Sequence, residues 1–99
     1  REWIAKLQAY DPDVVCFSVT TGMHLYFADI NRKVREALPK VLTIAGGPHP
    51  TFSPEYLEQG DFDAVCRGEG EQAMVELCDR LQNKQPIHDI QNLFVRDRR

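Results

Sequence analysis

Apolar residues occur along this chain in two patterns, short continuous runs and longer stretches with a helical period. The continuous runs, residues 14–19, 41–45 and 64–66, are each followed within three residues by a glycine. Runs of this kind are typical of strands that are covered on both faces, as in a parallel sheet. A shorter apolar segment at residues 92–96 predicts a last strand at an edge of the sheet.

Apolar residues spaced by three and four fill the segments between these runs and predict helices over residues 3–10, 23–37 and 71–81. A further short helix is expected with Ser53 as its cap and Pro54 at its first position, and it should end at Gly60. Helices and strands therefore alternate along the whole chain. Alternation with short connections predicts parallel strands joined by right-handed helical crossovers, which is an α/β fold.

In open parallel sheets, ligands bind outside the carboxyl ends of the strands. Gly46 and Gly47 lie at such an end and let the backbone approach a ligand closely, because no Cβ is in the way. Hydroxyl side chains follow the neighbouring strand, so this edge suits an extended polar ligand. A tight turn before a capped helix explains the glycine pair equally well. The candidate loops are residues 18–22, 46–51 and 67–71.

Composition and charge exclude several kinds of partner. The 99 residues make one domain at most. The net charge of −3 gives no electrostatic reason to expect nucleic acid or an anionic membrane, and no apolar run approaches the ~20 residues that a membrane span needs. Cys16, Cys66 and Cys78 have no close spacing. We expect them to be buried, reduced thiols in a cytoplasmic protein and not metal ligands.

Four motifs in this order resemble the cobalamin-binding domain of cobalamin-dependent radical SAM proteins. They are a strand that ends in Ser-x-Thr at residues 13–20, Gly-Gly-Pro-His-Pro-Thr at 46–51, Pro-Glu at 54–55, and a strand that ends in Gly-Glu-Gly-Glu at 63–71. The resemblance covers residues 1–96, and the combination of the two glycine motifs makes it specific. The most similar group includes the anaerobic magnesium-protoporphyrin IX monomethyl ester cyclase and related methyltransferases.

This resemblance implies a flavodoxin-like (Rossmann-like) parallel sheet of strand order 2-1-3-4-5, with helices on both faces. It also implies that the nucleotide tail of cobalamin runs between the Ser-x-Thr strand end and the Gly-Gly loop, with the corrin ring over the strand ends. No catalytic or metal-ligating residue is expected. The cofactor-binding residues that it implies are Ser18, Val19, Thr20, Thr21, Gly22, Gly46, Gly47, Pro48, His49, Gly68, Glu69 and Gly70.

Two motifs of the family are absent from this sequence: the Asp-x-His-x-x-Gly loop that supplies a cobalt ligand, and the Cys-x-x-x-Cys-x-x-Cys of the iron–sulfur cluster. By the family layout, residues 1–99 are a single, N-terminally truncated domain. A downstream radical SAM domain would then hold S-adenosylmethionine and the 4Fe-4S cluster, so the fragment alone should not be catalytic. Residues 14–19 would form an exposed apolar edge, which favours a homo-oligomer.

Two other functions stay open at this stage. The chain could be a flavodoxin-like scaffold that has lost its ligand. It could also be a nucleotide-binding domain, because residues 68–73 match Gly-x-Gly-x-x-Ala between a strand and a helix. Against the nucleotide, Glu69 and Glu71 would face the pyrophosphate, and Asp89 falls in a polar loop and does not end a second strand.

Overall fold

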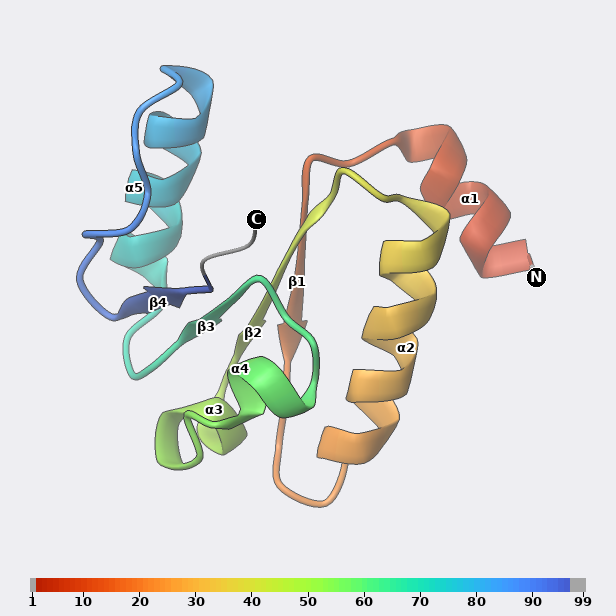
Figure 1. Cartoon of the computed structure of the whole chain (residues 1–99), viewed down its shortest axis with the longest axis horizontal. Helices are drawn as coiled ribbons and strands as arrows, with labels where there is room; N and C mark the ends of the chain where they lie inside the picture. The colour runs from red at the N-terminus through yellow and green to blue at the C-terminus, as the bar shows by residue number, and fades with distance from the viewer. Residues whose placement is uncertain (1, 97–99) are drawn as a thin grey trace.

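A sheet with helices on both faces forms the centre of the molecule (Figure 1). The computed structural model describes residues 2–96. Within this range the strands are β1 (Val14–Ser18), β2 (Leu42–Gly46), β3 (Ala64–Cys66) and β4 (Leu93–Val95), in the spatial order β1-β2-β3-β4. The helices are α1 (Glu2–Tyr10), α2 (His24–Ala37), α3 (Pro48–Phe52), α4 (Tyr56–Gln59) and α5 (Glu71–Gln82). The predicted α/β fold class is confirmed.

The three strands β1, β2 and β3 pair in parallel, as predicted. Val14 lies opposite Leu42 and Ser18 opposite Gly46 in the first pair, and Ile44 lies opposite Ala64 in the second. The carboxyl ends of these strands consequently lie on the same side of the sheet, toward the lower half of Figure 1. The candidate loops all follow strands at this edge.

The prediction of an all-parallel sheet is wrong for β4, which pairs with β3 in antiparallel fashion. Helix α5 carries the chain toward the amino ends of the parallel strands, and residues 83–92 then run back beside it (Figure 1). The chain therefore enters β4 from the opposite end. Asn92, with a φ of 69°, makes the turn into this strand. Its predicted place at an edge of the sheet is confirmed.

Between β2 and β3, the single predicted helix is replaced by two short ones. Pro48 occupies the first turn of α3, where its fixed φ favours a helix start. Ser53 is the C-cap of α3, not the N-cap of a later helix, and its N–H donates to the His49 carbonyl. Helix α4 then begins at Tyr56. Its predicted end at Gly60 is confirmed, because the Gly60 N–H donates to the Tyr56 carbonyl at 2.9 Å.

Buried apolar side chains form a layer on each face of the sheet. The layer under α5 contains Ile44, Ala64, Cys66, Ala73, Leu77, Ile90 and Leu93. The layer toward α2 and α4 contains Val19, Ala28, Ala45, Tyr56, Phe62 and Val65. Helices on both faces, as predicted, account for the nearly continuous apolar character of the strands.

Coverage by helices is uneven, and this overturns part of the cysteine prediction. Cys66 on β3 is buried, but Cys16 on β1 and Cys78 on α5 are exposed. The layer under α5 draws its buried side chains from β2, β3 and β4, and β1 adds only the half-buried Val14. All three thiols are free. No helix within residues 2–96 has the length and apolar character needed to cross a membrane.

Candidate functional site

A pocket of about 310 Å³ opens at the carboxyl ends of β1, β2 and β3, on the α5 side of the sheet. We call it the glycine groove, because glycines from the loops after β2 and β3 supply much of its wall. Ser18 of β1 and Met74 of α5 stand at its sides. The residues that line it are Cys16, Phe17, Ser18, Ile44, Gly46, Gly47, Cys66, Gly68, Gly70 and Met74.

Gly47 is required by the close approach of two backbone segments. Its φ is 98°, and a Cβ there would lie 3.0 Å from both the backbone N and O of Val19. The His49 N–H donates to the Val19 carbonyl at 3.0 Å, and the Val19 N–H donates to the Gly46 carbonyl at 2.8 Å. Only glycine fits this crossing without strain. Gly47 thus fixes the β2 loop against the end of β1.

Gly46 and Gly70 have a different role, because their missing side chains leave the groove open. A Cβ at Gly46 would make an ordinary contact of 3.8 Å with the Cβ of Cys66. A Cβ at Gly70 would lie 3.5 Å from the Cys66 Sγ. Neither position has the positive φ of Gly47. Larger residues would therefore fit the backbone here but fill the groove.

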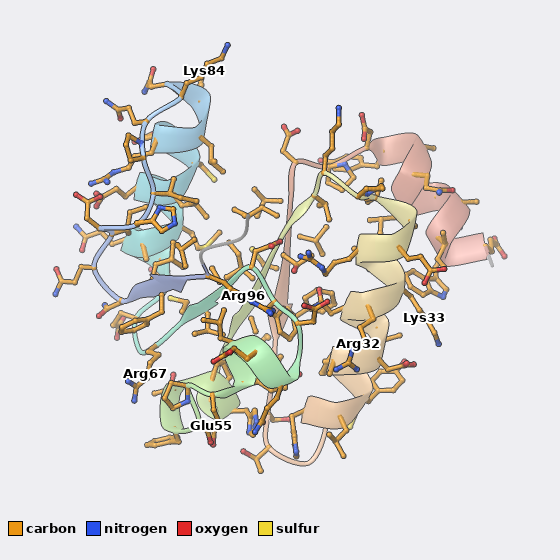
Figure 2. All side chains as sticks on the ribbon, in the orientation of Figure 1. Arg32, Lys33, Glu55, Arg67, Lys84 and Arg96 are labelled. Atoms are coloured by element: carbon orange, nitrogen blue, oxygen red, sulfur yellow. The ribbon has the colours of Figure 1, made fainter. Side chains whose placement is uncertain are left out.

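Thr51 joins the two glycine loops. Its Oγ1 donates to the Gly47 carbonyl at 2.9 Å and accepts from the Gly68 N–H at 3.0 Å. The Thr51 carbonyl accepts two hydrogen bonds from the Arg67 guanidinium, at 2.9 and 2.8 Å. Figure 2 shows Arg67 reaching from the end of β3 toward α3. Thr51 belongs to the motif at residues 46–51, but sequence reasoning gave it no role of its own.

His49 faces away from the groove, into the core under α2 and α4. It is 7% exposed, and its ring stacks on His24 with centroids 4.3 Å apart. The Tyr56 ring meets it edge-on, and the Thr21 hydroxyl lies 2.9 Å from its Nδ1. Burial, and then the neighbouring His24, lower the pKa of His49. Burial also raises the pKa of Tyr56 to about 12. These rings pack together at the base of the loop.

The structure brings some of the sequence-predicted site residues together and separates others. Ser18, Gly46, Gly47, Gly68 and Gly70 line the groove. The others do not line it: Val19 and His49 are buried in the core, and exposed positions are held by Thr20, Thr21, Gly22, Pro48 and Glu69.

Sequence reasoning missed the sulfur-containing and apolar side chains that form the floor of the groove. Cys16 precedes Ser18 by two positions, and Ile44 precedes Gly46 by two, so each pair shares a face of its strand. Cys66 and Met74 complete this floor from β3 and α5. The alternation of side chains along a strand was the signal that could have identified the first two.

Several known proteins are similar to this chain in sequence. A protein-family model described as the B12 binding domain matches residues 1–78. An uncharacterized methyltransferase from Pyrococcus horikoshii is 34% identical over 97 residues, which are 95% of this chain and 21% of that protein. The anaerobic magnesium-protoporphyrin IX monomethyl ester cyclase of Rubrivivax gelatinosus is 37% identical over 76 residues, covering 73% of this chain and 13% of the cyclase.

Solved structures share the fold. The radical S-adenosylmethionine methyltransferase TsrM from Kitasatospora setae superposes with a TM-score of 0.79 at 18% identity, over 93% of this chain and 20% of TsrM. The chain thus spans about a fifth or less of these relatives. The family match covers most of the chain, including β1 to β3 and the loops that follow them. The chain therefore belongs to the B12-binding domain family, as its resemblance to the cobalamin-binding domains of radical SAM proteins implied.

Proposed function

We propose that this domain holds cobalamin for a radical SAM domain in a longer protein, and that the glycine groove receives the cofactor's nucleotide tail. One observation carries the placement of the tail. Gly46 and Gly70 have no side chain, although the structure has room for one at both positions. Both glycines line the pocket at the strand ends, which is where open α/β sheets bind ligands. The supporting family match spans both loops.

The lining residues suit a slender ligand with a flat aromatic end. At about 310 Å³ the groove lies at the low end of small-molecule sites, which span roughly 300–1,000 Å³. It therefore suits the tail and not the whole cofactor. Ser18 offers a hydroxyl, and the glycine loops offer backbone groups. Cys66 and Met74 would face the aromatic base, and sulfur packs favourably on aromatic rings.

The part played by this chain is binding and not chemistry. Bound cobalamin supplies the capacity for methyl transfer or radical reactions at its cobalt. The titratable groups of the groove are Cys16 and Cys66. Burial raises the pKa of the Cys66 thiol, and partial desolvation, followed by the neighbouring Cys78 and Cys66, raises the pKa of the more exposed Cys16. They stay protonated near neutral pH, so neither is an activated nucleophile. We therefore assign to the groove only the tasks of holding and orienting the cofactor.

The named relatives support a proposal for the whole protein. They include methyltransferases and magnesium-protoporphyrin ester cyclases, and TsrM is a radical S-adenosylmethionine methyltransferase. We propose that the longer protein transfers a methyl group or closes a ring. In this proposal S-adenosylmethionine and a 4Fe-4S cluster bind in its downstream domain. The free thiols fit a cytoplasmic location.

The outer edge of β1 supports a second, structural proposal. In the described sheet β1 is an end strand, with Val14 and Val15 half-buried. Edges of this kind pair with other chains. We expect the 99-residue chain to form a homo-oligomer, which light scattering would detect. A monomer at high concentration would contradict this part of the proposal.

The binding proposal is tested by mixing the full-length protein with hydroxocobalamin, removing free cofactor by desalting, and recording the absorbance. We expect a retained corrin band. A protein that retains no corrin would be a ligand-free scaffold instead. If NAD, and not cobalamin, raised the melting temperature, the nucleotide hypothesis for residues 68–73 would replace it.

A further inference from the structure

We propose that Thr51 is a positioning residue that sets the width of the glycine groove by holding its two loops together. The inference rests on the proposed function, because it gives the groove its ligand. It goes beyond that function by naming a residue that touches no ligand and yet controls the affinity. Thr51 is half-buried and is not among the residues that line the groove.

One hydroxyl group of Thr51 makes two hydrogen bonds. Thr51 Oγ1 donates its proton to the Gly47 carbonyl at 2.9 Å and accepts the Gly68 N–H at 3.0 Å. A hydroxyl can serve as donor and acceptor at the same time. Gly47 stands on the β2 side of the groove and Gly68 on the β3 side. The hydroxyl therefore links the two walls directly, through a single oxygen atom.

Thr51 is itself held in place by Arg67, which directly follows β3. The Arg67 guanidinium donates from Nε and Nη2 to the Thr51 carbonyl, and it lies 5.8 Å above the Phe94 ring of β4. The Arg67 N–H donates to the Asn92 carbonyl at 2.9 Å. These contacts tie Thr51 to the two strands beyond β2. Thr51 is thus held both through its hydroxyl group and through its backbone carbonyl.

Gly68 needs the restraint that the Thr51 hydroxyl supplies. Its φ is 80°, and no atom outside Gly68 and its two chain neighbours lies within 4 Å of the position that a Cβ would take. Glycine has more backbone freedom than any other residue, and Gly68 is exposed. Without the hydrogen bond from the Gly68 N–H to Thr51, the loop after β3 would adopt many conformations, and the width of the glycine groove would vary. Binding would then have to order it, which lowers affinity.

The test compares Thr51→Val and Thr51→Ala, which both lack the hydroxyl, with Thr51→Ser, which keeps it. Arg32→Gln is the matched control, because it removes a side-chain bond to the Gln59 carbonyl at a site outside the groove. For each variant we would measure three quantities in the full chain. They are the hydrogen-exchange rate of the Gly68 amide by NMR, the melting temperature, and the dissociation constant for hydroxocobalamin.

We expect the Gly68 amide to exchange about tenfold faster in both hydroxyl-free variants, and their cobalamin affinity to fall about tenfold. Thr51→Ser should restore both quantities to within about threefold of the wild type. Arg32→Gln should change neither, even if its melting temperature falls. The alanine variant keeps the test available if valine prevents folding, since alanine is smaller than threonine.

Unchanged exchange at Gly68 in a folded hydroxyl-free variant would overturn the proposal, as would unchanged affinity. A failure of the proposed function looks different. In that case the wild-type chain binds no cobalamin, while the exchange rate of Gly68 still depends on the hydroxyl. The two failures are therefore distinguishable in the same set of samples.

Discussion

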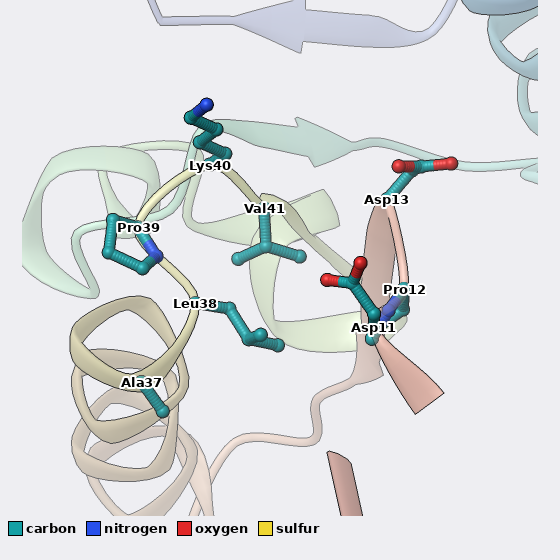
Figure 3. A pocket seen from close by; sticks show the side chains of 8 residues that line it. All are labelled: Asp11, Pro12, Asp13, Ala37, Leu38, Pro39, Lys40 and Val41. Atoms are coloured by element: carbon teal, nitrogen blue, oxygen red, sulfur yellow. The ribbon is translucent and has the colours of Figure 1, made fainter. Parts of the chain in front are cut away.

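Pockets of similar size lie at opposite ends of the parallel strands, and they are built differently. The pocket at the amino ends has a volume of about 340 Å³ and is drawn in Figure 3. Side chains of two chain reversals line it: Asp11, Pro12, Asp13, Ala37, Leu38, Pro39, Lys40 and Val41. The glycine groove, of about 310 Å³, contains glycines from the loops after β2 and β3.

The amino-end pocket is a consequence of the two turns that lead into β1 and β2. The Val41 N–H donates to the Leu38 carbonyl, and the Leu42 N–H donates to the Asp13 carbonyl, both at 3.0 Å. These bonds start β2 and align it with β1. In Figure 3, Leu38 and Val41 point into the space between the two reversals. Volume therefore does not distinguish the two pockets, whereas the missing side chains at the strand ends do.

The largest effect is expected from Gly47→Val. The new Cβ would lie 3.0 Å from the Val19 backbone at a φ of 98°, so the strain and the overpacking should together cost about 2–5 kcal/mol in unfolding free energy. Pro39→Ala, in an exposed turn of the amino-end pocket, should cost about 1 kcal/mol or less. Urea unfolding measures both. Equal stabilities would show that the close approach at Gly47 is not required.

The next effect concerns ligand affinity and contrasts the two pockets directly. Gly46→Leu should fill the glycine groove and weaken cobalamin binding at least ~tenfold, or about 1.4 kcal/mol, because a side chain there meets only ordinary contacts. Ala37→Leu places the same side chain in the amino-end pocket and should leave binding unchanged. Absorbance titration gives both constants. If Ala37→Leu weakened cobalamin binding more than Gly46→Leu, the cofactor would bind at the amino-end pocket instead.

A smaller effect is expected from pH, through His49. Burial and the nearby His24 lower its pKa below the ordinary value of 6.5, while Glu55 opposes the shift. The unfolded chain thus binds more protons than the folded one below pH 6.5. Stability should be complete above that pH and fall as the pH drops through the folded pKa. Urea midpoints between pH 5 and 8 check this, and His49→Asn should flatten the profile. A midpoint that rises on acidification would argue against a neutral, buried His49.

The smallest expected effect is a difference between the alkylation rates of two cysteines. Cys16 lines the glycine groove and Cys78 is exposed outside it, on α5. Bound cobalamin should therefore slow alkylation of Cys16 by a few-fold and leave Cys78 unchanged, as peptide mass spectrometry would show. Cys78 is an internal control in every sample. Equal protection of both thiols would indicate a ligand that binds elsewhere or a general change in the protein.

Much of the fold could be predicted because its signals are local. The run at residues 64–66 becomes β3 with the predicted bounds, since a continuous apolar stretch fits a strand covered on both faces. The direction of β4 could not be predicted. It depends on residues 83–92 returning beside α5, and Ile87 and Ile90 hold them there by packing on the core. Isolated apolar residues in a polar loop do not specify a path.

The location of the site, at the carboxyl ends of the strands, could be predicted from the sequence. The side chains that line it could not. Topology alone places Gly46 and Ser18 at one end of neighbouring strands. The inward turn of His49 depends on His24 and Tyr56, which come from other helices. The bond between Thr51 and Gly68 likewise joins residues 17 positions apart. Contacts of this kind depend on tertiary packing, which sequence spacing does not report.

The most direct test maps cobalamin onto the two pockets by NMR. Amide chemical shifts of the 99-residue chain would be recorded with and without hydroxocobalamin. We predict the largest changes at Gly46, Gly68 and Gly70, and none beyond noise at Asp13 and Lys40. Changes centred on the amino-end pocket, or binding that leaves the glycine groove unperturbed, would contradict the central claim.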